Sequence, residues 1–430
     1  MITVVRSAWA LLLGMFLLQV GNGLQSSLMG VRGAIEGFST FHSSLIGSAY
    51  FLGFLGGSSF APKFIARVGH VRVFAALASF ISAIVIAFPI VSDPYVWMIL
   101  RVGIGFCLSG VYVTAESWLN NSATNETRGQ SLSAYMLMQM MGLVAAQGIL
   151  ASGDPSGWLL FVIPSICVSL SFAPILLSAA PTPTVEATRA MSLKQLYVAS
   201  PFAVIGMLLM GAVFSGQFVM AAVYATEVGL NLQQLSAFIS AIFIGAIVLQ
   251  YPIGWMSDRM DRRLLIIGAS GLAALVSLAG AFFGGNYYAL LAFAALSGGL
   301  AQPLYALLIA YINDYLEPED MPAASGGMVF LNGIGAISGP PVMGLLMATI
   351  GPSGFWFFLA FVLACISIYG AYRVTQRPSA YTEDDDYDAV PYANIMPGAA
   401  SPVAVEAAQE FYVEAAEEMA SDDTTEEENR

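Results

Sequence analysis

The decapeptide Gly254-Trp-Met-Ser-Asp-Arg-Met-Asp-Arg-Arg263 connects two long apolar stretches, residues 235–256 and 264–284. Each stretch has about the 20 residues that a helix needs to cross the hydrocarbon of a bilayer at ~1.5 Å per residue. The connection between them holds three arginines. A basic turn between two apolar helices predicts a membrane hairpin whose turn lies in the cytoplasm, because cytoplasmic loops carry an excess of Lys and Arg.

The same pattern extends over most of the chain. Twelve apolar stretches cover residues 8–28, 42–62, 73–92, 96–118, 130–151, 158–178, 202–222, 235–256, 264–284, 287–311, 325–348 and 354–373. Of the 15 Lys and Arg residues, 13 lie at the N-terminus, in the even-numbered gaps or after the last stretch. The two exceptions are Arg32, in an odd-numbered gap, and Arg101, inside a stretch. This asymmetry predicts that both termini are cytoplasmic.

The composition agrees with a membrane protein. The chain is 57% apolar and 10% charged, with a mean hydropathy of +0.75, and these values exclude a water-soluble domain of 430 residues. The net charge of −13 belongs to the C-terminal tail, since residues 1–373 carry 13 cations and 13 anions. The net negative charge therefore does not indicate which ligands the apolar part binds. We expect no nucleic-acid partner.

The apolar stretches divide the chain into four parts. We predict a six-helix bundle over residues 1–180, a cytoplasmic linker over 181–200, a second six-helix bundle over 201–373 and an acidic, largely disordered cytoplasmic tail over 374–430. Six plus six spans joined by an inside linker are typical of carriers built from two repeats. The predicted fold class is an all-α membrane protein with 12 transmembrane helices in two pseudo-repeat bundles.

The loop at 254–263 resembles the loop signature of the major facilitator superfamily. That signature has Gly, three residues, Asp-Arg, one residue and Gly-Arg-Arg; here Gly254, Asp258 and Arg259 match, and Asp261 replaces the usual Gly. The matching gap of the first half keeps a shorter version with Ala66 at the acidic position. The expected gating-loop residues are Gly254, Asp258, Arg259, Arg262 and Arg263 in the second half and Arg67, Gly69 and Arg72 in the first.

The resemblance implies a role for these loops. In the superfamily the loop acid caps a neighbouring helix and pairs with Arg, which holds the cytoplasmic side closed. We therefore expect an intact latch on Asp258, Arg259 and Arg263, and a weakened one in the first half. The alternative is that these cations only follow the positive-inside rule, but this does not explain the Gly and Asp at those spacings.

Two further stretches are similar to superfamily motifs. Arg101-Val-Gly-Ile-Gly105 matches the pattern of an intramembrane Arg followed by Gly, and Gly339-Pro340 matches a Gly-Pro packing motif. The resemblance implies a bacterial secondary transporter of the inner membrane that works by alternating access. The span-five segment lacks the Gly-Pro motif that drug antiporters of the superfamily carry there, so a drug/proton antiporter is disfavoured.

Charged side chains inside a bilayer are costly and mark functional sites. Arg101, Tyr112 and Glu116 lie on one stripe of the fourth span, and 15 residues of helix separate Arg101 from Glu116 by roughly 22 Å, so the two cannot pair directly. One hypothesis makes Glu116 a protonatable coupling group and Arg101 its regulator or an anion anchor. The other has Glu116 satisfy helix ends and Arg101 bond to carbonyls of the first span.

Several amides and phenols are predicted at membrane depth. By the family resemblance, spans 1, 4, 7 and 10 line the central pathway, with 2, 5, 8 and 11 beside them. The predicted substrate-pathway residues are Gln19, Asn22, Gln25, Tyr112, Gln139, Gln217, Gln302, Tyr305 and Asn332. Each one alone is also compatible with helix–helix bonding. Together they favour a small polar or amphipathic solute over a charged one.

We find no catalytic triad, phosphate-binding Gly loop or metal-ligand cluster in the sequence, so we expect no enzyme activity, metal or cofactor. The expected partners are the lipid bilayer, a small-molecule substrate and, as a candidate coupling ion, the proton. A second hypothesis is a non-transporting receptor or assembly factor on the same fold that uses the acidic tail to bind a protein. The sequence of the tail is equally compatible with a solvated segment that binds no partner. Substrate, direction and coupling ion are not predicted.

Overall fold

The computed structural model describes residues 2–122, 125–177, 191–316, 320–376 and 405. Within these ranges, twelve helical segments are long and apolar enough to cross a membrane. The predicted fold class is therefore confirmed. The acidic tail beyond residue 376 and most of the linker lie outside the described residues, except for the short helix α8 (Leu193–Ala199), which ends the linker.

The first half holds six spans, of which the third and sixth each consist of two consecutive helical segments. Its elements are α1 (Ile2–Ile35), α2 (Thr40–Val68), α3 (His70–Ala87), the 3-10 turn η1 (Phe88–Ile90), α4 (Pro94–Ser122), α5 (Asn125–Ser152), α6 (Leu159–Ser171) and α7 (Ala173–Leu177).

The second half repeats this order, with two of its spans interrupted. Its elements are α9 (Pro201–Ser215), the π-helical turn η2 (Gly216–Met220), α10 (Ala221–Glu227), α11 (Leu232–Ser257), α12 (Arg262–Phe283), α13 (Tyr287–Ala301), α14 (Leu304–Asn313), α15 (Met321–Ile350) and α16 (Gly354–Val374). The seventh span comprises α9, η2 and α10, and the tenth comprises α13 and α14.

Side-chain caps fix where several helices begin. Ser39 accepts from the backbone N–H of His42 at the start of α2, and Asn231 forms a reciprocal capping box with Gln234 at the start of α11. Helices also run beyond the predicted apolar stretches, since the first one reaches Ile35 where the apolar pattern ends at 28. Hydropathy marks only the part of a helix that lies in hydrocarbon, whereas the backbone bonds continue into the polar region.

Equivalent helices pack in equivalent pairs in the two halves. In the first half α1 packs on α5, α2 on α4 and α3 on α6; in the second, α9 packs on α15, α11 on α13 and α12 on α16. Glycines permit the closest of these approaches. A Cβ on Gly105 of α4 would lie 1.9 Å from the carbonyl oxygen of Tyr50 on α2, and one on Gly245 of α11 would lie 1.9 Å from that of Ala295 on α13. The two halves thus repeat one packing arrangement.

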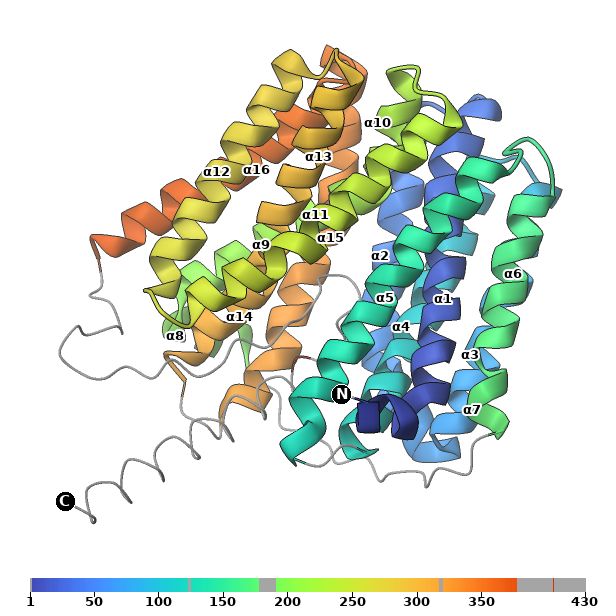
Figure 1. Ribbon diagram of the computed structural model, residues 1–430, viewed down its shortest axis with the longest axis horizontal. Coiled ribbons are helices and arrows are strands. Elements are labelled where there is room, and N and C mark those ends of the chain that lie inside the picture. The colour runs from blue at the N-terminus through green and yellow to red at the C-terminus, as the bar shows by residue number, and fades with distance from the viewer. Residues whose placement is uncertain (1, 123–124, 178–190, 317–319, 377–404, 406–430) are drawn as a thin grey trace.

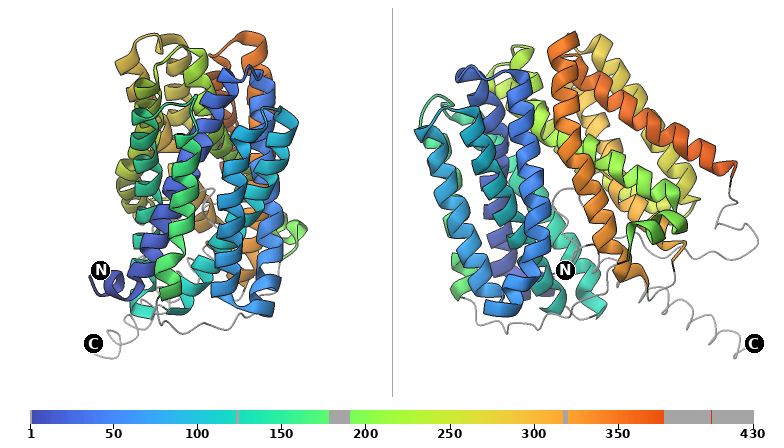
Figure 2. Two further views of the ribbon diagram at one scale, coloured as in Figure 1. Left: turned by 90° about the vertical axis from the view of Figure 1, so that its right-hand side faces the viewer. Right: turned by 180° about the vertical axis from the view of Figure 1, so that it is seen from behind.

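The two halves converge at one end and diverge at the other (Figures 1 and 2). At the converging end Thr40 of α2 donates to Glu227 of α10, and Ser48 of α2 donates to the carbonyl oxygen of Ile337 on α15. Tyr50 of α2 also packs on Phe218 of η2, with ring centroids 6.3 Å apart. The diverging end carries the loops around Gly69 and Asp258.

Candidate functional site

A network of amides and a phenol joins three helices of the first half. Gln19 of α1 lies at its centre: its Oε1 accepts from the hydroxyl of Tyr112 at 2.6 Å and from Nδ2 of Asn22 at 3.1 Å. Its Nε2 donates to Oε1 of Gln139 on α5 at 3.2 Å. All four side chains are buried. The structure therefore brings together four of the predicted pathway residues, from α1, α4 and α5.

Arg101 on α4 is fully buried without an ionic partner among the described residues. Its Nη1 donates to Oε1 of Gln25 on α1, and its guanidinium lies 4.8 Å from the centroid of the Tyr50 ring. Its Nε and Nη2 have no hydrogen-bond acceptor in the described part of the chain. The predicted bonds to carbonyls of the first span are not the contacts found here, because Arg101 uses a side-chain amide and an aromatic face. Such a cation–π contact stabilises a desolvated guanidinium.

Glu116 lies at the other end of the same stripe on α4. Its carboxylate accepts from the hydroxyl of Tyr135 on α5 at 3.0 Å, and the side chain is 2% exposed. It also interacts electrostatically with Tyr305 of α14, which belongs to the opposite half. Glu116 is thus a carboxylate held at membrane depth by a phenol of the neighbouring span.

The interruptions in the seventh and tenth spans place two glutamines against each other. Gln217 lies in the π-helical turn η2, and Gln302 lies between α13 and α14, just before Pro303. Nε2 of Gln302 donates to Oε1 of Gln217 at 2.9 Å, and Nε2 of Gln217 donates to Ser297 at 3.2 Å. Discontinuous helices at membrane depth are where carriers of this architecture place their binding sites.

The two remaining pathway candidates differ in their surroundings. Tyr305 is buried on α14 one turn beyond Gln302. Asn332 on α15 instead donates to the backbone carbonyl of Met207 on α9 at 3.4 Å. This contact lies in the close α9–α15 packing, so the structure associates Asn332 with helix packing and not with the polar network.

The loop at 254–263 is held by ion pairs between buried arginines and partly buried aspartates. Asp261 accepts from the backbone N–H of Arg263 at the start of α12, and the carboxylate also lies 3.5 Å from the Arg263 guanidinium. Arg262 pairs with Asp314 at the end of α14, at 2.5 Å. The Gly-to-Asp departure at 261 therefore supplies the cap of the next helix, where a carboxylate is favoured by the helix dipole.

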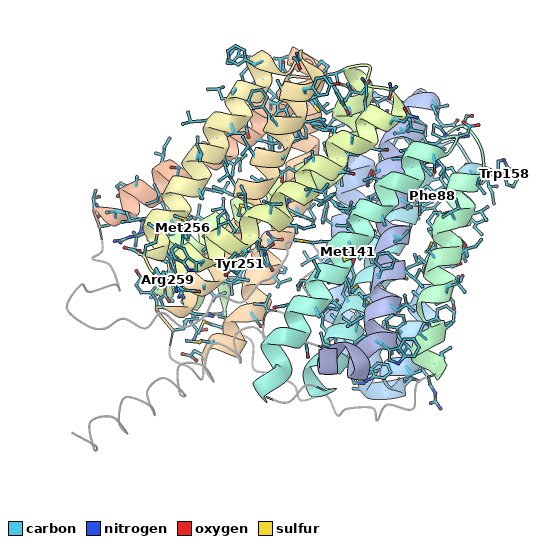
Figure 3. The ribbon with its side chains drawn as sticks, in the orientation of Figure 1. Phe88, Met141, Trp158, Tyr251, Met256 and Arg259 are labelled. Atoms are coloured by element: carbon cyan, nitrogen blue, oxygen red, sulfur yellow. The ribbon has the colours of Figure 1, made fainter. Side chains whose placement is uncertain are left out.

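The other loop residues are arranged around the end of α11. The backbone N–H of Asp258 donates to the carbonyl of Gly254 at 3.2 Å, and Asp258 ends α11. Arg259 donates to the carbonyl of Trp255 at 3.2 Å, with its guanidinium 4.4 Å from the centroid of that ring. Figure 3 shows Arg259 beside Met256 at this end of α11, far from Trp158 at the opposite end of the molecule.

The first-half loop has a different character. Gly69 adopts a φ of +84° between α2 and α3, a conformation that glycine adopts without strain. Arg67 and Arg72, on either side of it, are exposed, and neither forms an ion pair with any described residue. The cations of this loop are thus not neutralised as Arg262 and Arg263 are in the second half.

Sequence reasoning missed three contributors to these sites. Tyr50 faces Arg101 from α2, and Asp314 neutralises Arg262 from the end of α14. Ser297 supplies the acceptor for Gln217. Asp314 carried a usable signal, because it follows the tenth span at the same predicted membrane face as Arg262. No sequence signal distinguished Tyr50 or Ser297, since each lies in a span that contains other residues of similar type.

Together, the repeated six-helix halves and the polar side chains buried between their helices define a polytopic membrane carrier. The sequence profile of the Major Facilitator Superfamily matches residues 11–243 and 203–392, and the chain belongs to this family. It is an integral multi-pass protein of the inner membrane and a transporter by family.

Individual proteins agree with this assignment. The chain is 25% identical over 371 residues to the uncharacterized MFS-type transporter YfkF of Bacillus subtilis (strain 168), covering 82% of this chain and 90% of that protein. Among solved structures, a variant of the nucleoside transporter NupG matches with a TM-score of 0.72 at 14% identity, covering 86% of this chain and 98% of the other. A bacterial homologue of the human lysosomal transporter Spinster, inward-facing and unoccupied, matches with a TM-score of 0.65 at 13% identity, over 94% and 97%.

Proposed function

We propose that this transporter is a secondary active carrier that moves a small polar or amphipathic solute by alternating access, with Glu116 as its proton-coupling group. The observation that carries the proposal is the position of Glu116: a carboxylate buried inside the fourth span that accepts a hydrogen bond from Tyr135 of the fifth. Binding a proton neutralises a charge buried at membrane depth, and a state that exposes this carboxylate to water favours its charged form, which is how protonation and conformation become coupled.

The arrangement of the halves supports alternating access. They meet through Thr40–Glu227 and Ser48–Ile337 at one end, whereas the loops around Gly69 and Asp258 lie at the diverging end. The positive-inside orientation makes these basic loops and both termini cytoplasmic. In that orientation the structure corresponds to an inward-facing state.

The composition of the buried network supports the substrate class. The amides and phenol around Gln19, and the Gln217–Gln302 pair of the second half, offer donors and acceptors without a net charge. Aromatic rings lie nearby, since Phe214 stacks on Phe218 with centroids 5.5 Å apart. Such a lining favours a neutral or zwitterionic solute with both polar groups and an apolar surface.

Identifying a substrate comes first in the test. A thermal-shift screen of the solubilised protein covers metabolites and drugs, with sugars and nucleosides included because NupG is a nucleoside transporter. A ligand that binds only the folded state raises the melting temperature. Hits then enter counterflow assays in proteoliposomes. Solute exchange supports a carrier, whereas binding without flux would support a receptor or an assembly factor that uses the tail to bind a protein.

Glu116→Gln is the decisive variant for coupling. We expect it to abolish uphill accumulation driven by a proton gradient while leaving counterflow exchange, because an amide keeps the shape of the site but cannot release a proton. Asp154→Asn, an exposed acid between α5 and α6, is the matched control and leaves both activities intact. If Glu116→Gln still accumulated the solute against its gradient, Glu116 would have no part in coupling.

A further inference from the structure

A cavity of about 350 Å³ lies between the ends of α2 and α3, outside the polar network. It is lined by Phe64, Val68, Val73 and Leu77, with Arg67 and Arg72 beside this apolar wall. Its volume lies within the roughly 300–1,000 Å³ that is usual for small-molecule sites. The cavity thus combines two cations with an apolar surface, and this combination is complementary to an amphiphilic anion.

The two arginines of this cavity have their charges available. Neither forms an ion pair with a described residue, and both are exposed. The equivalent loop of the second half provides the contrast, because Arg262 pairs with Asp314 and Arg263 with Asp261. Ala66 stands where the superfamily pattern has an acid, so the first-half loop has lost the group that would neutralise its cations.

The surroundings of the cavity are those of a lipid-facing surface. Phe60 on α2 is 49% exposed and Phe80 on α3 is 60% exposed. In a chain with twelve spans, large apolar side chains exposed on the outside of the bundle face acyl chains. The cations lie at the helix ends, and these ends belong to the side that the excess of Lys and Arg makes cytoplasmic.

We infer that this cavity binds an anionic phospholipid of the cytoplasmic leaflet. Arg67 and Arg72 hold the phosphate, and the start of an acyl chain lies against Phe64, Val68 and Leu77. Basic pockets between helices on the cytoplasmic side bind such head groups, and guanidinium groups form charge-assisted hydrogen bonds with phosphate. The inference is independent of the solute and of the role of Glu116.

Lipid binding to the full chain tests the inference. The purified protein in detergent is titrated with phosphatidylglycerol or phosphatidylcholine, and bound lipid is counted by native mass spectrometry. We expect phosphatidylglycerol to bind more tightly, with about a fivefold loss of affinity for each arginine changed to Gln and roughly 25-fold for Arg67→Gln/Arg72→Gln. The control Lys194→Gln/Arg373→Gln removes the same charge outside the cavity and should keep the preference.

Two further variants separate a specific site from lost folding. Arg67→Lys/Arg72→Lys keeps the charge and should retain most of the phosphatidylglycerol preference. Ala66→Asp leaves both arginines in place but supplies the missing acid, so it should weaken anionic lipid binding as the Gln variant does. The inference is wrong if the Arg-to-Gln variant still prefers phosphatidylglycerol. Equal binding of the two lipids to the unmodified full chain, as expected if the acidic residues after 376 cover the arginines, would also overturn it.

Discussion

Arg101 lies on α4 with its guanidinium against Gln25 and the face of Tyr50, and it has no acidic partner among the described residues. Two of its nitrogen atoms lack a protein acceptor there. Burying a cation in this way costs stability unless its hydrogen bonds and charge are satisfied. We therefore propose that Arg101 is kept at membrane depth for its function, as an intramembrane ionisable residue commonly is.

Arg101→Met tests this reasoning, since methionine keeps an unbranched side chain but removes the charge. We expect the melting temperature of the variant to be unchanged or higher and transport to fall at least tenfold. Arg32→Met is the matched control, because Arg32 pairs with Glu36 at 2.6 Å and donates to the Pro155 carbonyl, so its loss should lower the melting temperature. If the melting temperature of Arg101→Met fell as far as that of Arg32→Met, and transport fell only as much as the amount of folded protein, Arg101 would have a structural role.

At the residue scale, sequence predicted the polar positions better than their partners. Gln19, Asn22, Tyr112 and Gln139 were predicted separately and form one network. The sequence places Asp314 and Arg262 at the same predicted membrane face, but it does not pair them, because they lie 52 residues apart and meet only through the packing of α12 on α14. The capping role of Asp261 was not predicted for another reason. The family pattern shows only that Asp replaces Gly at this position, whereas its role as a cap depends on α12 beginning at the next residue.

At the element scale, a polar clasp joins three loops at the converging end of the first half. Arg32 of α1 pairs with Glu36, and its guanidinium also donates to the carbonyls of Pro155 and Ser156 between α5 and α6. Ser92, before α4, donates to the carboxylate of Glu36. This explains the one cation in an odd-numbered gap: Arg32 is held by the clasp and does not report the orientation of the membrane.

The clasp predicts a pH-dependent stability. The hydrogen bond from Ser92, helped by the charge of Arg32, lowers the pKa of Glu36 below its ordinary value of 4.5, although burial opposes the shift. A lowered pKa means that the folded state favours the carboxylate. Its stabilisation is therefore present at neutral pH and declines as the pH falls below about 4.5.

Thermal unfolding of Glu36→Gln across this pH range measures the effect. The variant should be less stable than the unmodified protein at neutral pH by about 0.5 kcal/mol, because partly exposed ion pairs contribute little. The difference should shrink as the pH falls into the acidic range. Ser92→Ala removes the leading cause of the shift and should reproduce part of the loss. A difference that stayed constant with pH would show that the charge of Glu36 does not stabilise the fold.

At the element scale, the sequence predicts the spans and one of the helix breaks, but not the π-helical turn. Twelve spans follow from apolar length alone, because each must cover the same hydrocarbon thickness. The break at Gln302 follows from Pro303, which cannot donate a helical hydrogen bond. The π-helical turn at Gly216–Met220 has no such signal. It depends on packing against α15 and α16, which sequence periodicity does not record.

At the scale of the whole molecule, two repeated bundles follow from the apolar pattern, but their relative tilt does not. The tilt depends on which end of the interface has the stronger contacts. At the converging end, Thr40 donates to Glu227, Ser48 donates to the Ile337 carbonyl, and a Cβ on Gly47 would clash with Val219. These contacts join α2 to the seventh and eleventh spans, so in the proposed alternating-access cycle an outward-facing state has to break them.

In that cycle we expect Glu227→Gln to shift the conformational equilibrium toward the outward-facing state. A hydrogen bond to a charged group is stronger than one to an amide, and a loss of about 1 kcal/mol changes a two-state ratio roughly fivefold. Spin labels on Ile35→Cys and Val228→Cys, both exposed at the converging end, report the separation of the halves once Cys107, Cys167 and Cys365 are replaced. We expect Glu227→Gln to enrich the longer distance and Asp154→Asn, an acid at the same end that makes no described contact with the second half, to leave it unchanged. An unaltered distance distribution in Glu227→Gln would mean that the aromatic packing of Tyr50 on Phe218 closes this end without help from the hydrogen bond.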